Sequence, residues 1–389
     1  MGSLLLVLIY VCFISLGLPD SLLGSAWPVL HSQISVPLSY AGFISATIFI
    51  GTIISSLFSG KLLSKFSAGK VTAVSIVLTS FGLFGFSISH SFWMLILFAV
   101  PYGLGAGGVD AILNNYVALH YKAQHMSWLH CMWGVGAAIS PYIMSYSLIR
   151  LESWNYGYLI VSIIQAVISV IVFISIPVWK KQAAEDCSET SAKPLSFKEI
   201  FSVKGAVACF FLFFSYCSME LTASLWASSY LVQKWSFSPE AAAGYASMFY
   251  LGITLGRFAN GFLAMKLSDH TLIRAGLSII TLGIACLFVP TSSVFALIGF
   301  CVIGLGCAPV YPCIIHMTPD VFGAERSLAM IGVQMAFAYT GFLLMPPLFG
   351  VIAQYISISL LPAYLAVFLV LMVITHTLVY KSYKAGRSK

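Results

Sequence analysis

Charged side chains inside long apolar stretches are the residues of this chain with the greatest capacity for chemistry. A charge at the centre of a bilayer costs about 2.5–3.5 kcal/mol on insertion scales, so such groups face a wet cavity or one another. Carboxyl groups along one pathway are typical of a proton or cation relay. We predict proton-coupling roles for the three acids and a gating role for the arginine, with a buried structural role as the alternative for each. The four residues are Asp20, Asp110, Glu220 and Arg257.

Polar and aromatic side chains near these charges form a second set of candidates, for binding a solute. Asn114 follows Asp110 at i+4, so the two residues share one face of a helix. Asn offers both donors and acceptors, which suits a sugar because a sugar presents both. Hydrogen bonding between helices, or packing, is the alternative for each member of the set. The predicted solute-binding residues are Asn114, Asn115, His130, Trp133, Gln165, Trp226, Tyr311 and Gln334.

The composition indicates which elements must hold these residues. Of 389 residues, 60% are hydrophobic and 8% are charged, and the mean hydropathy is +0.97. A soluble domain carries about 25% charged residues. The composition therefore excludes an ordinary soluble enzyme, a nucleic-acid binder and a disordered regulator.

Sequence motifs of enzymes and metal proteins are missing from the chain. It has no P-loop, HExxH or GxSxG motif, so neither ATP-driven transport nor intramembrane enzymology has support in the sequence. The 9 Cys residues form no CxxC pair and no Cys/His cluster. We therefore predict no enzyme activity, no metal site, no disulfide framework and no cofactor.

Twelve apolar segments, separated by short breaks, account for most of the chain. A helical crossing of a hydrocarbon core about 30 Å thick takes about 20 residues. Continuous apolarity disfavours a membrane barrel, whose strands alternate in polarity. The segments are 3–30, 39–60, 70–89, 92–119, 126–149, 156–179, 204–232, 240–265, 271–289, 294–317, 327–355 and 357–380.

The basic residues predict how these segments are oriented. Of the 19 Lys and Arg residues, all except Arg150, Lys234 and Arg257 lie in breaks that share one side of a membrane with both termini. Cytoplasmic loops carry an excess of Lys and Arg, so we predict that both termini are cytoplasmic. The first segment has no basic residue before its apolar run, and we interpret it as an uncleaved span.

An internal repeat divides the segments six and six. At an offset of 201 residues, Gly51 aligns with Gly252, and Gly103-Leu104-Gly105 aligns with Gly304-Leu305-Gly306. Parallel repeats related by an axis along the membrane normal are one architecture of secondary transporters. We predict an all-α membrane protein with 12 transmembrane helices in two six-helix halves. The predicted parts are an N-terminal half (1–179), a cytoplasmic linker (180–203) and a C-terminal half (204–389).

Four motifs that contain the candidate residues follow one another along the chain. They are Gly103-Leu104-Gly105 before Asp110 and Asn114, Leu129-His130 before Trp133-Gly134-Val135-Gly136-Ala137 and Pro141, Tyr216 before Glu220 and Trp226, and Gly256-Arg257 before Gly261. With the loop residues Gly60-Lys61-Leu62 and Gly69-Lys70, these motifs resemble the fucose:proton symporter branch of the major facilitator superfamily, which also includes glucose/mannose symporters. The resemblance extends over essentially all twelve segments.

This resemblance implies the major facilitator fold and proton-coupled sugar uptake by alternating access. Members of the branch use an acid in span 1 and an acid in span 4 for the proton and the sugar, and these match Asp20 and Asp110. The span-4 acid is usually Glu, where this chain has Asp110. The branch is Asn-rich before its span-1 acid, where this chain has Leu18-Pro19.

Three hypotheses follow from the sequence. The first is a secondary active transporter, monomeric in the inner cell membrane, that carries a monosaccharide or similar polar solute with a proton or sodium ion. The second is an exporter or facilitator of an amphipathic compound, because 29 Phe and 13 Met residues could line a permissive cavity. The third is a non-transporting membrane receptor with the break 180–203 as its partner site. In all three the partners include the lipid bilayer and exclude nucleic acid.

Overall fold

Helices form every regular element in the part of the chain that the structure describes. The computed structural model describes residues 2–63, 65–121, 123–183 and 197–387. Each of the twelve predicted apolar segments falls on one helix or on consecutive helices. The prediction of an all-α protein is confirmed for these residues.

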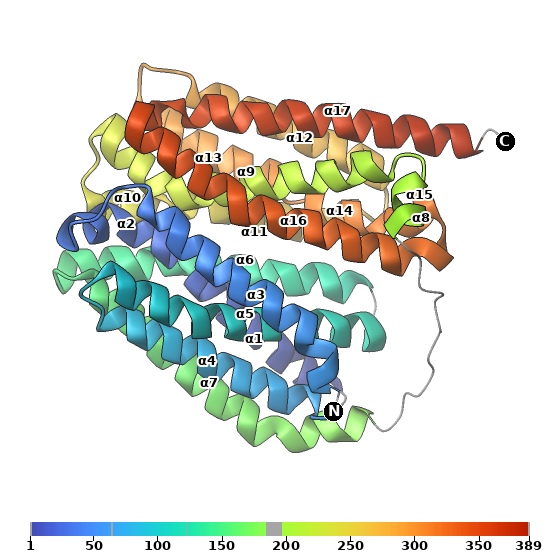
Figure 1. Cartoon of the computed structure of the whole chain (residues 1–389), viewed down its shortest axis with the longest axis horizontal. Coiled ribbons are helices and arrows are strands. Elements are labelled where there is room, and N and C mark those ends of the chain that lie inside the picture. The colour runs from blue at the N-terminus through green and yellow to red at the C-terminus, as the bar shows by residue number, and fades with distance from the viewer. Residues whose placement is uncertain (1, 64, 122, 184–196, 388–389) are drawn as a thin grey trace.

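The helices form two groups whose long axes run in a common direction (Figure 1). In the first group α1 packs against α6, and α5 packs against α3 and α4. Within the described residues, the elements of the N-terminal part are α1 (Gly2–Asp20), α2 (Leu22–Gln33), α3 (Tyr40–Leu63), α4 (Ala68–Ser87), α5 (Phe92–His120), α6 (Ala123–Arg150) and α7 (Trp154–Ala183).

The second group repeats this arrangement with more breaks. Here α9 packs against α16 and α17, and α13 packs against α11 and α12. The elements are α8 (Phe197–Ser202), α9 (Ala206–Trp235), α10 (Pro239–Tyr245), α11 (Ser247–Leu263), α12 (Asp269–Leu287), α13 (Ser293–Cys307), α14 (Val310–His316), α15 (Thr318–Phe322), α16 (Ala324–Ile352), the π-helical η1 (Ala353–Ser357), the 3₁₀-helical η2 (Ile358–Leu360) and α17 (Leu361–Arg387).

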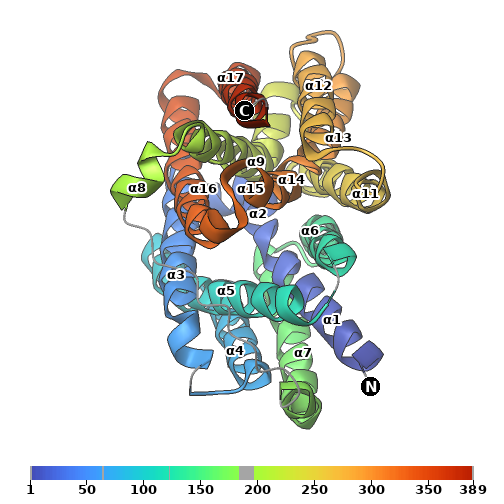
Figure 2. The ribbon, with the colours of Figure 1, turned by 90° about the vertical axis from the view of Figure 1, so that its right-hand side faces the viewer.

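Both chain ends lie at the same end of the molecule (Figure 1). Figure 2 views that end and shows α3 beside α16 on one side and α6 beside α11 on the other, which are contacts between the two groups. At the opposite end α2 packs against α9. The short helix α10 also packs against α6 and α2, so the two groups meet along several helix pairs that surround the interior.

Three of the predicted segments are broken helices, and two of these breaks lie near candidate residues. The helix α1 ends at Asp20, one residue after Pro19, and α13 ends before Ala308-Pro309. Proline disrupts a helix because it has no backbone N–H and its ring clashes with the preceding turn. Irregular backbone at membrane depth is tolerated where it is buried in protein or lines a cavity. These breaks therefore mark interior positions.

Eight helical stretches among the described residues are long and apolar enough to cross a membrane. One stretch, Met330–Lys384, takes in two predicted segments because α16 and α17 are joined by η1 and η2 without a polar break. The helix α11 has 17 residues and is not one of these stretches. The helices thus account for a multi-pass membrane protein.

The packing of the two groups follows the 201-residue offset seen in the sequence. A Cβ atom on Gly103 would overlap the carbonyl oxygen of Ile48, and one on Gly304 would overlap that of Phe249. Each member of the second pair is 201 residues after its counterpart in the first. Close helix approach through glycine, between α3 and α5 and again between α11 and α13, is therefore a repeated feature of the fold.

Replacing Gly304 with Ala should lower the melting temperature of the purified protein in detergent. The added Cβ would meet backbone atoms of Phe249 and Ile253, so α11 and α13 must separate. Overpacking of this kind costs about 1–3 kcal/mol. Gly332→Ala is the matched control, because nothing lies within 4 Å of the Cβ position there. Equal melting temperatures for the two variants would contradict the close approach.

Candidate solute cavity and charge cluster

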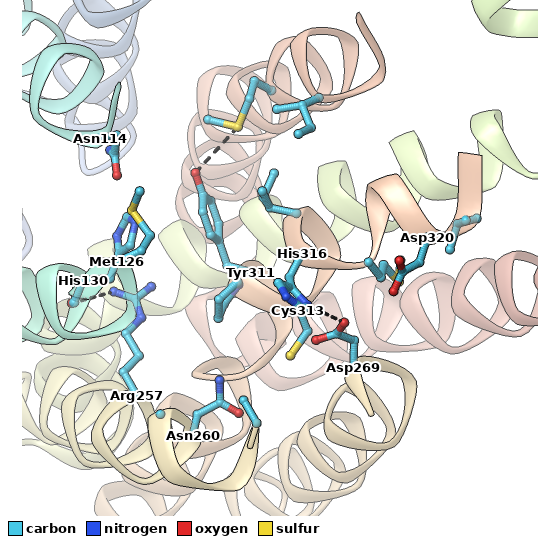
Figure 3. Close-up of a pocket in the computed structure, with 18 of the residues that line it drawn as sticks. Asn114, Met126, His130, Arg257, Asn260, Asp269, Tyr311, Cys313, His316 and Asp320 are labelled. Carbon is cyan, nitrogen blue, oxygen red and sulfur yellow. Dashed lines mark hydrogen bonds and ion pairs between the residues drawn. The ribbon is translucent and has the colours of Figure 1, made fainter. Parts of the chain in front are cut away.

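One large cavity lies between the two groups of helices. Its volume is about 1260 Å³. Its walls come from the C-terminal halves of α5 and α11, the N-terminal parts of α6, α12 and α16, the short helices α14 and α15, and residues of α3 and α17. Figure 3 shows the polar side chains that point into it from these elements. The polar residues in the cavity lining include Asp110, Asn114, His130, Arg257, Asn260, Asp269, Tyr311, His316, Asp320 and Tyr339.

On the α5 wall of the cavity, Asp110 and Asn114 are bonded to each other. Nδ2 of Asn114 donates to Oδ1 of Asp110 at 2.8 Å and to the Asp110 backbone carbonyl at 3.0 Å. The i+4 spacing on α5 produces this contact, as the sequence predicts. The pair presents a carboxyl group and an amide to the cavity, which is a surface that can both accept and donate hydrogen bonds.

His130 and Tyr311 approach each other across the boundary between the groups. Their ring centroids are 5.8 Å apart, and His130 also meets the ring of Phe13 at 5.7 Å. The Tyr311 ring packs on Phe213 at 4.8 Å, and its hydroxyl reaches Sδ of Met335 at 3.6 Å. Two aromatic residues from different halves of the chain thus border the same cavity.

Asp20 lies outside the wall of this cavity, on the other side of Trp133. Its carboxylate accepts hydrogen bonds from Nε1 of Trp133 at 2.7 Å and from the hydroxyl of Tyr102 at 3.3 Å. The Asp20 side chain is exposed, although Asp20 lies at the end of α1 between helices. Two hydrogen-bond donors on its carboxylate satisfy the requirement that a polar group inside a membrane protein has partners.

Arg257 connects the two groups of helices. Within its own group, Nη2 of Arg257 lies 3.6 Å from Oε1 of Glu220, and both side chains are less than a tenth exposed. Toward the first group, Nη1 donates to the backbone carbonyl of His130 at 3.3 Å. The guanidinium also lies 4.7 Å from the centroid of the Trp133 ring, a cation–π geometry. Asp20, Trp133, Arg257 and Glu220 therefore form one connected set, called the central cluster below.

Asn260 is a cavity residue that the sequence predictions omit. It follows Arg257 by three positions on α11, is 5% exposed and lines the cavity. No described residue hydrogen-bonds its Oδ1 atom. The signal was available, because Asn260 is one of four Asn residues in the chain and shares a helix face with Arg257.

Three predicted solute-binding residues connect helices in this structure and are not part of the cavity wall. Gln165 accepts a hydrogen bond from the Ser15 hydroxyl at 2.6 Å and donates to the Ser15 carbonyl. Nε1 of Trp226 donates to the Pro346 carbonyl at 3.0 Å. Their solute-binding roles remain predictions.

The other predicted solute-binding residues are Gln334, Trp133 and Asn115. Like Gln165 and Trp226, Gln334 lies outside the cavity wall, and its amide donates to the Thr318 hydroxyl at 3.0 Å. Trp133 belongs to the central cluster. The side chain of Asn115 lies outside the part of the chain that the structure describes. No group of three or more His, Cys, Asp or Glu side chains among the described residues could hold a metal ion.

The family of the chain follows from a comparison with known protein families. The model of the Major Facilitator Superfamily matches residues 9–226 and 208–388. The chain belongs to this superfamily. It is therefore a multi-pass membrane transporter and not an enzyme, and the superfamily resemblance found in the sequence is confirmed.

The chain is similar in sequence to two named proteins. Bypass of stop codon protein 6 of Saccharomyces cerevisiae is 24% identical over 330 residues, which are 76% of this chain and 65% of that protein. The glucose/mannose transporter GlcP of Bacillus subtilis is 23% identical over 251 residues, 62% of this chain and 60% of that protein. The matches thus cover less than two thirds of either relative's length.

Solved structures support the same fold. A bacterial homolog of the human lysosomal transporter Spinster, in an inward-facing and occupied conformation, superposes with a TM-score of 0.71 at 13% identity. The match covers 98% of this chain and 97% of that chain. The inward-facing, unoccupied conformation of that homolog gives a TM-score of 0.72. At this identity the likeness concerns the fold alone.

Proposed function

We propose that this transporter is a proton-coupled symporter of a monosaccharide or a similar polar solute. The observation that carries the proposal is the cavity that Asp110, Asn114 and His130 of one half share with Arg257 and Tyr311 of the other. Secondary transporters bind substrate near the midplane at the interface of their repeats. Donors and acceptors on both walls suit a solute rich in hydroxyl groups.

The arrangement of the halves supports an alternating-access mechanism. The proposed halves are residues 1–179 and 204–389, with six spans each, joined by the linker 180–203, of which 184–196 lie outside the described residues. Basic residues favour cytoplasmic termini in an inner membrane. The cavity walls come from the helix portions nearest the end with both termini, whereas α2 and α9 pack together at the other end. This combination corresponds to an inward-facing state.

The central cluster supplies the proposed link between proton binding and the movement of the halves. Arg257 contacts the first half through the His130 carbonyl and the Trp133 ring, and Trp133 in turn donates to Asp20. A carboxyl group binds protons differently in wet and in apolar surroundings. Asp20 and Asp110 would therefore load and release a proton as the surrounding helices open and close.

A relative supports a sugar as the solute, and the cavity wall supports an alternative. GlcP is described as a glucose/mannose transporter. However, four methionines also line the cavity, namely Met126, Met265, Met317 and Met335. Methionine is adaptable and is common at permissive binding surfaces. The second candidate function is therefore facilitated movement or export of an amphipathic compound.

Liposomes that contain the purified protein and an internal pH dye test these two functions. Hexoses, deoxyhexoses and disaccharides are added outside, one at a time. We expect acidification of the lumen with one sugar and no quenching of hydrophobic dyes by the protein. Dye binding without sugar-driven acidification would overturn the proposal in favour of the amphipathic solute. A sodium gradient in the same liposomes tests sodium as the coupling ion.

A further inference from the structure

A second, smaller cavity lies on the outer surface where α9 begins and α17 ends. Its volume is about 540 Å³. It is separate from the solute cavity, because the two share no lining residue. We call it the lysine groove, and its lining consists of Val203, Lys204, Gly205, Val207, Ala208, Leu378, Lys381 and Ser382.

The charge of the lysine groove is positive and uncompensated. Lys204 precedes the first turn of α9, and Lys381 lies in the last turns of α17. Both side chains are exposed, and among the described residues neither has an ion-pair partner. Two ammonium groups from different helices that converge on one groove create a site for an anion.

Gly205 contributes backbone without a side chain to the lining of the groove. Gly205 has a φ of +86° and precedes α9, and a Cβ there would lie 3.0 Å from Cβ of Ser382. The absence of a side chain at Gly205 lets α17 approach the start of α9 and leaves the groove unfilled. The N-terminus of α9 is the positive end of its helix dipole, so α9 adds a weak positive potential to the groove beside the two lysines.

Apolar side chains lead away from the groove along both helices. Val207 and Phe211 follow one another at i+4 on α9, and Ile374 and Leu378 do so on α17. These four side chains are between 41% and 51% exposed. In a protein that crosses a bilayer, exposed apolar side chains on outer helices face acyl chains. The groove therefore combines an anion site with an apolar surface that begins at the same point.

We infer that the lysine groove binds the headgroup of an anionic glycerophospholipid. The phosphate lies between Lys204 and Lys381, and the acyl chains lie over Val207, Phe211 and Ile374. A free phosphate would use the lysines but not the apolar surface, so the combination favours a lipid. The site is at the height where the apolar helices end, which is the height of lipid headgroups. This inference does not depend on which solute the protein carries.

Native mass spectrometry of the full-length protein in detergent, titrated with phosphatidylglycerol, tests the inference. A juxtamembrane lysine contributes about fivefold in affinity for anionic lipid, so the double variant Lys204→Ala/Lys381→Ala should bind roughly 30-fold more weakly. Lys65→Ala/Lys70→Ala is the matched control. It removes two exposed lysines, Lys65 in the connection between α3 and α4 and Lys70 in the first turn of α4, and neither lines a cavity.

The outcomes separate a built lipid site from general charge attraction. Loss of phosphatidylglycerol binding in the groove variant, with binding retained in the control, supports the inference. Equal losses in both variants overturn it, because net charge would then explain binding. Equal affinity for phosphatidylcholine would also overturn it, as would binding of inorganic phosphate as tight as that of the lipid.

Discussion

Replacing Asp110 with Asn is expected to abolish accumulation of solute against its gradient while sparing solute exchange. An amide does not take up and release a proton near neutral pH, so the proton gradient loses its coupling group. An Asn side chain at this position can still accept the hydrogen bond that Asn114 donates to Oδ1 at 2.8 Å, so the cavity wall keeps its shape. Uphill uptake and counterflow exchange in the same liposomes measure the two activities separately.

Asp320→Asn is the matched control for this prediction. Asp320 lines the same cavity, is exposed, and undergoes the same change of carboxyl to amide. We expect this variant to keep uphill uptake. Proton-driven accumulation by Asp110→Asn at the wild-type level would rule out Asp110 as the coupling acid. The melting temperatures of both variants are measured alongside, so that a folding defect is recognised as such.

Replacing Arg257 with Met is expected to lower the melting temperature more than any surface substitution and to stop transport. The change leaves the Glu220 carboxyl buried, with its partner at 3.6 Å removed. Breaking a buried ion pair from one side costs about 3–5 kcal/mol. The variant also loses two of the contacts between α11 and α6, at the His130 carbonyl and the Trp133 ring. Thermal unfolding in detergent and uptake in liposomes measure the two effects.

The double variant Glu220→Gln/Arg257→Met separates charge pairing from simple loss of packing. Because both charges are then gone, the double variant should melt at a higher temperature than Arg257→Met alone. Arg274→Met is the control. Arg274 is exposed and lies 4.1 Å from the ring centroid of Tyr380, so it loses an arginine–aromatic contact without leaving a buried acid. Additive losses in the double variant would argue against the Glu220 pairing.

The fold was largely predictable because lipid imposes strong rules on a sequence. The apolar segments predicted the positions of the helices to within several residues. In hydrocarbon only helices and closed barrels satisfy the backbone, and the segments lack the alternating polarity of barrel strands. The glycine repeat predicted equivalent contacts 201 residues apart, and Gly103 and Gly304 make them. The position of Asp110 beside Asn114 also followed from helix geometry, because both residues lie on one helix.

The sequence alone did not indicate which residues on different helices contact each other. Apolar segments that are hydrophobic all round do not indicate which face points inward. Gln165, Gln334 and His130 were therefore all predicted to bind the solute. In the structure, Gln165 and Gln334 hydrogen-bond to Ser15 and Thr318 outside the cavity wall. The sequence places Asn260 on the helix face of Arg257, but only the packing of α11 shows that this face lines the cavity.

By itself the sequence determined the class of the protein, its helices, its repeat and the set of charges that must avoid lipid. Each of these follows from local chemistry, namely the cost of a charge or an open backbone group in hydrocarbon. Only the tertiary structure decided that Arg257 pairs with Glu220, and that Trp133 lies between Arg257 and Asp20. These residues come from helices far apart in the chain, so their meeting depends on the packing of the two groups of helices.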